Sequence, residues 1–162
     1  MKLRKLQYRD APLMLEWMHD PLVVKNLLTN FESKTLKDCE LFINRAQNTS
    51  ENLHLAIVND DDVYMGTVSL KSILNKTAEF AITIRKTAMG KGYSIFGMKE
   101  IIRIGFEVLD LKFIYWCVDP MNKRAVRFYD KNAYQRINVN NQEIAGYTKE
   151  QRQRFIWYGI DK

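Results

Sequence analysis

The clearest chemical signal in this sequence is a turn with two glycines between a predicted strand and a predicted helix. Before the turn, residues 78–84 alternate large apolar and small or polar side chains, as a half-buried strand does. After it, apolar residues recur at helical spacing: Ile95, Met98, Ile102, Phe106 and Leu109. The turn itself reads Met89-Gly90-Lys91-Gly92-Tyr93-Ser94. Glycines permit a sharp turn with unpaired N–H groups, and a helix start adds partial positive charge. The pattern therefore predicts a phosphate-binding site and a phosphorylated ligand.

Two familiar phosphate loops do not fit this turn. It lacks the third glycine of a dinucleotide fingerprint and the acidic residue that the fingerprint places after the next strand. It also lacks the Gly-Lys-Ser/Thr ending of a nucleotide triphosphatase loop. Lys91 and Arg85 can supplement the backbone N–H groups, although both also suit a solvated surface. Because a pair of glycines is often only a turn, the segments that follow carry much of the prediction.

Those segments form a regular series. Residues 113–118 are a continuous apolar run typical of a central strand. Asp119-Pro120-Met121-Asn122 then turns the chain, and Pro120 fixes the backbone near a helix start. Residues 122–132 are a predicted helix that ends at Asn132, a residue type that tolerates the left-handed conformation. Residues 133–137 are another predicted strand.

In this order, and in the run Asn122-Lys123-Arg124-Ala125-Val126-Arg127-Phe128-Tyr129, the chain resembles the GNAT superfamily of acetyl-coenzyme A-dependent N-acetyltransferases. It is most similar to the branch with ribosomal-protein-alanine and amino-sugar acetyltransferases. The match runs from about residue 79 to about residue 134. Two positions depart from the family pattern. Thr87 stands where Gln or Arg is usual, and Ala133-Tyr134 replaces a usual Gly-Phe.

The resemblance implies acetyl-CoA as co-substrate and a set of residues that bind it. Backbone at Ile84 would hydrogen-bond the pantetheine arm, as would the side chain of Asn122. The glycine turn would bind the phosphates through its N–H groups. The predicted cofactor-binding residues are Ile84, Arg85, Met89, Gly90, Lys91, Gly92, Tyr93, Ser94 and Asn122.

Acetyl transfer to an amine also needs a base and an acid. An alkyl ammonium has a pKa near ~10, and a thiol has one near ~8.5, so one group must accept a proton and another must return one. By the resemblance, Tyr129 would protonate the departing sulfur and Glu79 would be the general base, directly or through a water. From the residues alone, Tyr129 also fits a core aromatic, and Glu79 also fits a strand start paired with a surface lysine. Direct attack in a ternary complex suits a chain without a recognisable Cys-His or Ser-His arrangement.

The remaining segments indicate a mixed α/β chain. We expect strands at 3–8, 53–59, 63–73, 79–84 and 155–160, and helices at 10–18 and 35–47, with Asp10 as an N-cap and an irregular stretch at 20–33. This is the layout of a GNAT fold, a mixed, mostly antiparallel sheet flanked by helices. The length of 162 residues predicts one domain, 1–162.

Composition sets the cellular context. With 46% hydrophobic and 27% charged residues, and no apolar run near ~20 residues, the sequence predicts a globular protein with no membrane partner. No secretory leader is recognised, and Cys39 and Cys117 form no metal or disulfide pattern, so we expect a cytoplasmic protein. His19 and His54 are isolated, and no metal site is predicted. The net charge of +6 fits a solvated surface or attraction of the coenzyme phosphates, and scattered basic residues argue against nucleic acid.

The acceptor is the least defined part of the prediction. By the resemblance, residues 17–31 and 138–147 shape its site, and their polar residues suit a sugar or a peptide: Asp20, Asn138, Asn140, Asn141 and Gln142, with Glu32 just beyond. Residues 64–70 resemble amino-sugar acetyltransferases, so we expect a small-molecule amine such as a nucleotide-linked amino sugar. A protein N-terminal (peptide) amine stays open, as does a non-catalytic acyl-CoA sensor. A homodimer through an exposed last strand also stays open.

Overall fold

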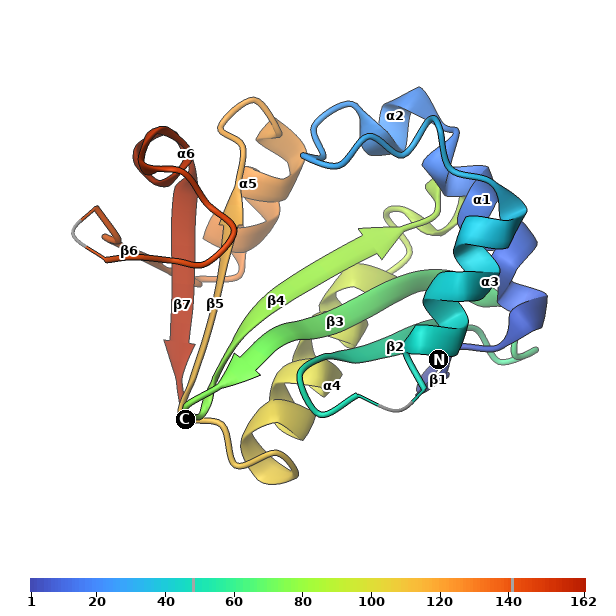
Figure 1. Cartoon of the computed structure of the whole chain (residues 1–162), viewed down its shortest axis with the longest axis horizontal. Helices are drawn as coiled ribbons and strands as arrows, with labels where there is room; N and C mark the ends of the chain where they lie inside the picture. The colour runs from blue at the N-terminus through green and yellow to red at the C-terminus, as the bar shows by residue number, and fades with distance from the viewer. Residues whose placement is uncertain (48, 141) are drawn as a thin grey trace.

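The computed structural model describes residues 1–47, 49–140 and 142–162, and Figure 1 shows a twisted sheet with helices on both faces. Within these ranges seven strands pair in the order β1-β2-β3-β4-β5-β7-β6. The strands are β1 (Lys2–Lys5), β2 (Leu53–Val58), β3 (Tyr64–Leu74), β4 (Thr77–Ile84), β5 (Phe113–Val118), β6 (Gln135–Ile137) and β7 (Ile156–Asp161). The helices are α1 (Ala11–Met18), α2 (Pro21–Val24), α3 (Leu36–Arg45), α4 (Tyr93–Glu107), α5 (Lys123–Lys131) and α6 (Lys149–Arg154), with single turns η1 (Tyr8–Asp10) and η2 (Lys86–Ala88).

The sheet is mixed, and one pair of strands separates along its length. All neighbouring strands are antiparallel except β4 and β5. These two are parallel and pair only at their beginnings, where Thr77 to Glu79 face Phe113 to Tyr115. Beyond that point β4 turns away toward α1 and α2, while β5 continues beside β7 (Figure 1). The predicted mixed, mostly antiparallel fold is confirmed, and its one parallel pair creates an opening in the sheet.

The two faces of the sheet bury different helices. On one face the apolar stripe of α4 packs against β3 and β4, and Met98 and Ile101 are fully buried. On the other face α1 and α3 cover β2 and the start of β3, with Trp17 and Ile43 in that core. The predicted alternation along β4 holds, since Phe80 and Ile84 belong to the α4 face. Glu79, Ala81 and Thr83 therefore point to the opposite face.

Three local details of the structure differ from the sequence-based prediction. The stretch at 20–33 contains the short helix α2, because the Asp20 side chain accepts a hydrogen bond from the Leu22 N–H and starts a turn. Helix α6 was not predicted, because its sequence Lys-Glu-Gln-Arg-Gln-Arg has no apolar stripe. The helix begins there because the Thr148 side chain caps its N-terminus. After α5 the left-handed residue is Ala133, with φ 59°, and not Asn132.

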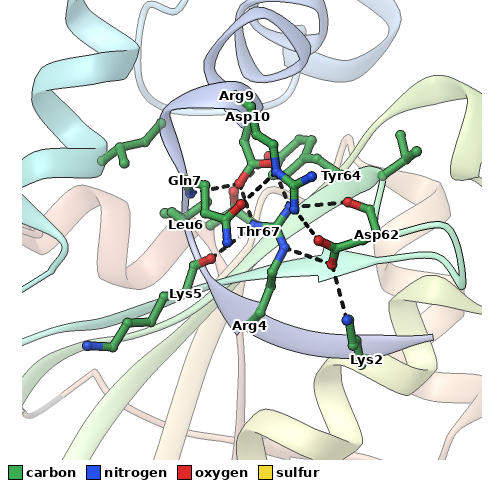
Figure 2. Close-up of polar contacts among 12 residues, drawn as sticks. Lys2, Arg4, Lys5, Leu6, Gln7, Arg9, Asp10, Asp62, Tyr64 and Thr67 are labelled. Carbon is green, nitrogen blue, oxygen red and sulfur yellow. Dashed lines mark hydrogen bonds and ion pairs between the residues drawn. The ribbon is translucent and has the colours of Figure 1, made fainter.

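Asp10 begins α1 without capping it by its side chain. Figure 2 shows why: its carboxylate accepts two hydrogen bonds from Arg4, at 2.7 and 2.8 Å, and one from the Gln7 N–H at 2.9 Å. Arg4 also donates to Asp62 at 3.0 Å, which Lys2 and Arg9 contact as well. This network joins the N-terminal strand to the β2–β3 hairpin, so the predicted N-cap is instead an anchor between distant segments.

The last strand does not form an edge of the sheet. Strand β7 lies between β5 and β6, and Tyr158 is fully buried. The prediction of an exposed last strand as a dimer contact is therefore wrong, because β6 folds back and covers it; β1 and β6 are the edges. In the part of the chain that the structure describes, no helix is both long and apolar enough to cross a membrane.

Candidate active site

A cleft of about 1030 Å³ opens where β4 and β5 separate. Its walls include residues from both faces of β4, with Phe80 and Ile82 on one and Glu79 and Thr83 on the other. The opposite walls come from the end of β5, from α5 along its length, from the segment around α2 and from the segment before α6. The cleft therefore runs through the sheet from one face to the other, so two molecules can meet in it from opposite sides.

The glycine turn forms one mouth of this cleft. Gly90 and Gly92 have φ of 75° and 87°, a conformation that favours glycine. Gly92 is the N-cap of α4, and no side chain among the described residues caps the helix, so its first N–H groups have no partner within that part of the chain. Met89, Gly90, Gly92 and Ser94 line the cleft. The turn therefore presents a helix N-terminus to an anion, the chemistry predicted from its sequence.

The other predicted phosphate ligands lie differently. Lys91 and Tyr93 belong to the turn and are not among the residues that line the cleft. Arg85 is buried beneath it: its guanidinium makes a two-pronged ion pair with Glu16, at 3.1 and 2.8 Å, and donates to the Tyr64 carbonyl at 3.0 Å. These bonds use three of the five guanidinium N–H groups of Arg85 and join the end of β4 to α1 and β3. The predicted phosphate contact of Arg85 is therefore replaced by an anchoring role.

Asn122 and Ile84 lie on opposite walls of the cleft. Asn122 is the N-cap of α5, and its Oδ1 accepts a hydrogen bond from the Ala125 N–H at 3.2 Å. Its amide NH₂ donates to none of the described residues. Ile84 is the last residue of β4, beyond the part that pairs with β5. Both positions can therefore offer donors to a chain-like ligand that lies between the strands.

Tyr129 lies in an aromatic cluster on α5 and borders the cleft. Its ring packs against Trp116 and Tyr158, with centroids 5.4 and 5.0 Å away, and 7% of the residue is exposed. Burial, with smaller contributions from Tyr158, Tyr134 and Cys117, raises the pKa of Tyr129 well above its ordinary value. The hydroxyl donates to none of the described residues. It is thus a protonated, unpaired donor at the cleft wall.

Glu79 provides the carboxylate on the other face. It is 8% exposed, and its Oε1 accepts hydrogen bonds from Lys71 Nζ at 3.1 Å and from Tyr147 Oη at 2.6 Å. No described residue donates to Oε2. Because the residue lines the cleft, one oxygen is held by the protein and the other remains able to accept a proton.

Two cleft residues were not singled out from the sequence. In the sequence, Tyr147 stood out only as the last residue of the acceptor segment 138–147. Its contact with Glu79 could not be foreseen, because the two residues are 68 positions apart. Cys117 lies on β5 two residues after Tyr115, on the same face of the strand. Burial raises the pKa of Cys117 to about 11, with a smaller opposing effect from Tyr147. The thiol therefore stays protonated near neutral pH and is a poor nucleophile.

The histidines have structural partners. His19 Nε2 lies 2.8 Å from the Lys34 carbonyl and joins the end of α1 to the segment before α3. His54 Nδ1 lies 2.7 Å from Ser69 Oγ, and burial, with a smaller effect of Lys71, lowers the pKa of His54 to about 4. Among the described residues no three His, Cys, Asp or Glu side chains gather as a metal site would need. Both cysteines are free thiols.

The predicted acceptor segments do border the cleft, but with other residues. Asn26, Thr29 and Phe31 line it from the first segment, and Gly146 and Tyr147 line it from the second.

The predicted polar set does not line it: Asp20, Glu32, Asn138, Asn140 and Gln142 lie elsewhere. Asp20 and Asn138 accept bonds from N–H groups two residues ahead, so their side chains build turns. Asn141 lies outside the described residues.

Comparison with known proteins agrees with this geometry. The model of the acetyltransferase (GNAT) domain family matches residues 1–135. Spermidine N(1)-acetyltransferase of Escherichia coli is 27% identical over 81% of this chain and 70% of its own length. Acetyltransferase PseH of Campylobacter jejuni is 21% identical over 80% of each chain. The crystal structure of Vibrio cholerae spermidine N-acetyltransferase in complex with CoA and spermine superposes with a TM-score of 0.80, at 20% identity, over 99% of this chain and 94% of the other.

Proposed function

The chain belongs to the GNAT acetyltransferase family of acetyl-CoA-dependent N-acetyltransferases, and from that premise we propose that Glu79 and Tyr129 carry out acetyl transfer to an amino sugar. The observation that carries the proposal is that both residues line one cleft, one with a carboxylate oxygen and the other with a hydroxyl that lacks a partner among the described residues. Oε2 of Glu79 has no donor among the described residues, and the Tyr129 hydroxyl is an unpaired donor. A base and an acid are therefore available on the two sides of one opening in the sheet.

The reaction uses these groups in sequence. The acceptor amine gives a proton to Oε2 of Glu79, directly or through a water, and its lone pair attacks the thioester carbonyl. The C–N bond forms and the C–S bond breaks. The departing thiolate takes the Tyr129 hydroxyl proton, and the amide nitrogen loses its remaining extra proton to water. Exchange with water then returns a proton to the Tyr129 phenolate and removes the proton from Glu79, so both groups regain their starting states. The protonated thiol of Cys117 fits this direct transfer, because no enzyme nucleophile is needed.

Acetyl-CoA fits the opening from the side of α4 and α5. The unpaired N–H groups at the start of α4 suit its diphosphate, and the two glycines keep side chains away from that approach. The amide of Asn122 and the backbone of Ile84 flank the gap in which the pantetheine arm would lie. With the cofactor bound in this way, its thioester would lie between β4 and β5.

An amino sugar suits the acceptor end because that end has many neutral polar groups and little free negative charge. Asn26, Thr29 and Thr83 offer hydroxyl and amide partners, and Phe31 offers an aromatic face. The carboxylates in the described lining are Glu79 and Asp119, and each already has a cationic partner: Lys71 pairs with Glu79, and Arg154 pairs with Asp119. A neutral ring with one amine and several hydroxyls matches this lining better than a polycation does.

A polyamine is the second candidate acceptor. The relative at 27% identity is a spermidine N(1)-acetyltransferase, and the superposed Vibrio cholerae structure contains spermine. For a polyamine the positive Lys71 in the lining is unfavourable, because it would repel a second ammonium near Glu79.

The test is release of free thiol from acetyl-CoA against a panel of amines, after calorimetry has established that acetyl-CoA binds. The panel contains glucosamine, a nucleotide-linked amino sugar, spermidine and a peptide with a free N-terminus. We expect release with an amino sugar and at least ~10-fold less with spermidine at equal concentration. Thiol release with spermidine alone, or with the peptide alone, would show that the acceptor is that amine and not an amino sugar. Binding without release from any amine would favour a sensor and overturn the catalytic proposal.

A further inference from the structure

We propose that Tyr147 is a positioning residue for the proposed base: its hydroxyl, with the Lys71 ammonium, occupies Oε1 of Glu79 and so reserves Oε2 for the acceptor amine. The inference rests on the proposed role of Glu79. It adds a residue from the segment that precedes α6, far along the chain from the strand that carries the base.

The ring of Tyr147 is anchored independently of its hydroxyl. It packs edge-on against Trp157, with centroids 5.0 Å apart at 74°, and against Phe155 at 6.4 Å. The Tyr147 carbonyl accepts a hydrogen bond from Arg152 Nη1 at 2.9 Å. These contacts fix the ring on the apolar cluster beside β7, so the hydroxyl reaches the cleft from a rigid support.

The hydroxyl then determines which carboxylate oxygen is free. Tyr147 and Lys71 reach Oε1 from different elements, at 2.6 and 3.1 Å, and two donors on one oxygen oppose rotation of the carboxylate. Lys71 alone would not do so, because its ammonium is on a flexible side chain that is 36% exposed and can pair with either oxygen. Without the tyrosine donor, Lys71 can therefore move onto Oε2 and compete with the amine.

The protonation state of Tyr147 suits a permanent donor. Burial, with smaller contributions from Cys117 and Glu79, raises the pKa of Tyr147 far above its ordinary value. The phenol therefore keeps its proton near neutral pH and donates a hydrogen bond to the carboxylate. Tyr147 does not need to touch either substrate to affect the reaction.

A matched pair of variants tests the proposal. Tyr147→Phe keeps the ring on Trp157 and removes the donor. Tyr115→Phe is the control, because Tyr115 faces Glu79 across the β4–β5 pair and its hydroxyl donates to none of the described residues. With the amine that reacts in the panel above, we expect Tyr147→Phe to lower kcat about tenfold, with KM for acetyl-CoA within about twofold, as loss of a charge-assisted hydrogen bond would do. Tyr115→Phe should stay within about twofold in both.

A double-mutant cycle separates positioning from support of the fold. In a Glu79→Gln background, Tyr147→Phe should cause less than about a twofold further loss of kcat, because a residue that acts through Glu79 has nothing left to position. An equal tenfold loss in both backgrounds would overturn the proposal and assign Tyr147 a structural role. Unchanged kcat in Tyr147→Phe would also overturn it.

A measurement without any acceptor separates this inference from the proposed function. A tyrosine hydroxyl whose oxygen lies 2.6 Å from a carboxylate oxygen should give a downfield, slowly exchanging hydroxyl resonance in proton NMR. We expect Tyr147→Phe to remove it, Glu79→Gln to move it, and Tyr115→Phe to keep it. A resonance that Glu79→Gln leaves in place overturns the positioning contact, whatever the activity. A wild type that acetylates no amine of the panel, with this pattern intact, overturns the proposed function and leaves the contact supported.

Discussion

Asp10 and Glu79 are both buried carboxylates with cationic partners, and the structure uses them in opposite ways. Asp10 is 2% exposed, and both of its oxygens accept hydrogen bonds, from Arg4 and from the Gln7 N–H (Figure 2). Glu79 is 8% exposed, and its two described donors share one oxygen. The first carboxylate is saturated by the protein, whereas the second keeps an oxygen for a ligand.

The cationic partners of the two carboxylates also differ in how rigidly they bind. Arg4 is a planar fork that binds Asp10 through two nitrogens and Asp62 through a third. Lys71 is a single charge on a flexible stem at the edge of a cleft. A saturated, planar pair holds distant segments together, and a half-satisfied carboxylate can take part in proton transfer. The burial of a carboxylate is therefore a weaker guide to function than the number of its oxygens left without a donor.

Removal of the cation from each site should produce the largest contrast, in stability. Arg4→Met leaves Asp10 buried without its partner, and we expect the free energy of unfolding to fall by about 3–5 kcal/mol. Lys71→Met should cost less than about 1 kcal/mol, because its ammonium is partly solvated and Tyr147 still donates to Glu79. Urea unfolding of the two variants and the wild type measures both. Equal losses would show that the two networks do not differ in structural weight.

Replacement of the Glu79 carboxylate in the cleft should give the next largest effect, which is a loss of activity. Glu79→Gln abolishes a proton acceptor, and we expect kcat to fall about 100-fold, equivalent to about 2.7 kcal/mol of barrier. Binding of acetyl-CoA by calorimetry should be unchanged. Glu107→Gln, on the exposed side of α4 with Arg103 as partner, is the control for loss of a carboxylate elsewhere. A fall of less than tenfold for Glu79→Gln would remove it as the base.

Loss of the acid on the opposite wall should be smaller. Tyr129→Phe keeps the ring against Trp116 and removes the proton donor, and we expect at least about a tenfold loss of turnover with acetyl-CoA affinity retained. Tyr134→Phe, in the same aromatic cluster and away from the cleft lining, should change turnover less than twofold. Thiol release at saturating acetyl-CoA compares the two. Equal turnover in the wild type and Tyr129→Phe would show that Tyr129 is not the acid that protonates the departing sulfur.

The smallest expected effect is a change in stability at low pH that depends on Asp62, the second carboxylate that Arg4 contacts. Desolvation opposes the shift, yet hydrogen bonds from Arg4, Arg9 and Lys2 lower the pKa of Asp62 to about 2. Because the folded-state pKa lies below the unfolded value of about 3.9, the contribution of Asp62 to stability is complete above about pH 4 and is lost as pH falls toward 2. The stability gap between wild type and Asp62→Asn should therefore narrow from pH 5 to pH 2.5 in urea unfolding. A gap that is constant with pH would contradict this assignment.

How far the sequence could predict the site depends on the distance between partners. The glycine turn, Asn122 and Tyr129 fall within one strand–turn–helix series, and the structure places them around one cleft. Tyr147 contacts Glu79 from 68 residues away, and no local pattern marks it. Arg85 illustrates the converse, since its position beside the turn suggested a phosphate ligand, and Glu16 on α1, far away in sequence, takes its guanidinium.

The sequence by itself determined the order of the elements, the mixed sheet, the alternation along β4 and the glycines at the start of α4. Each of these follows from local periodicity or from backbone conformation, which neighbouring residues control. Only the tertiary structure decided that β4 and β5 part after three paired residues, that β7 lies inside the sheet, and that both described donors to Glu79 reach Oε1. These outcomes depend on which distant segments pair with a given strand edge or bind a given polar atom. Such contacts form between residues far apart in the sequence, so local patterns do not reveal them.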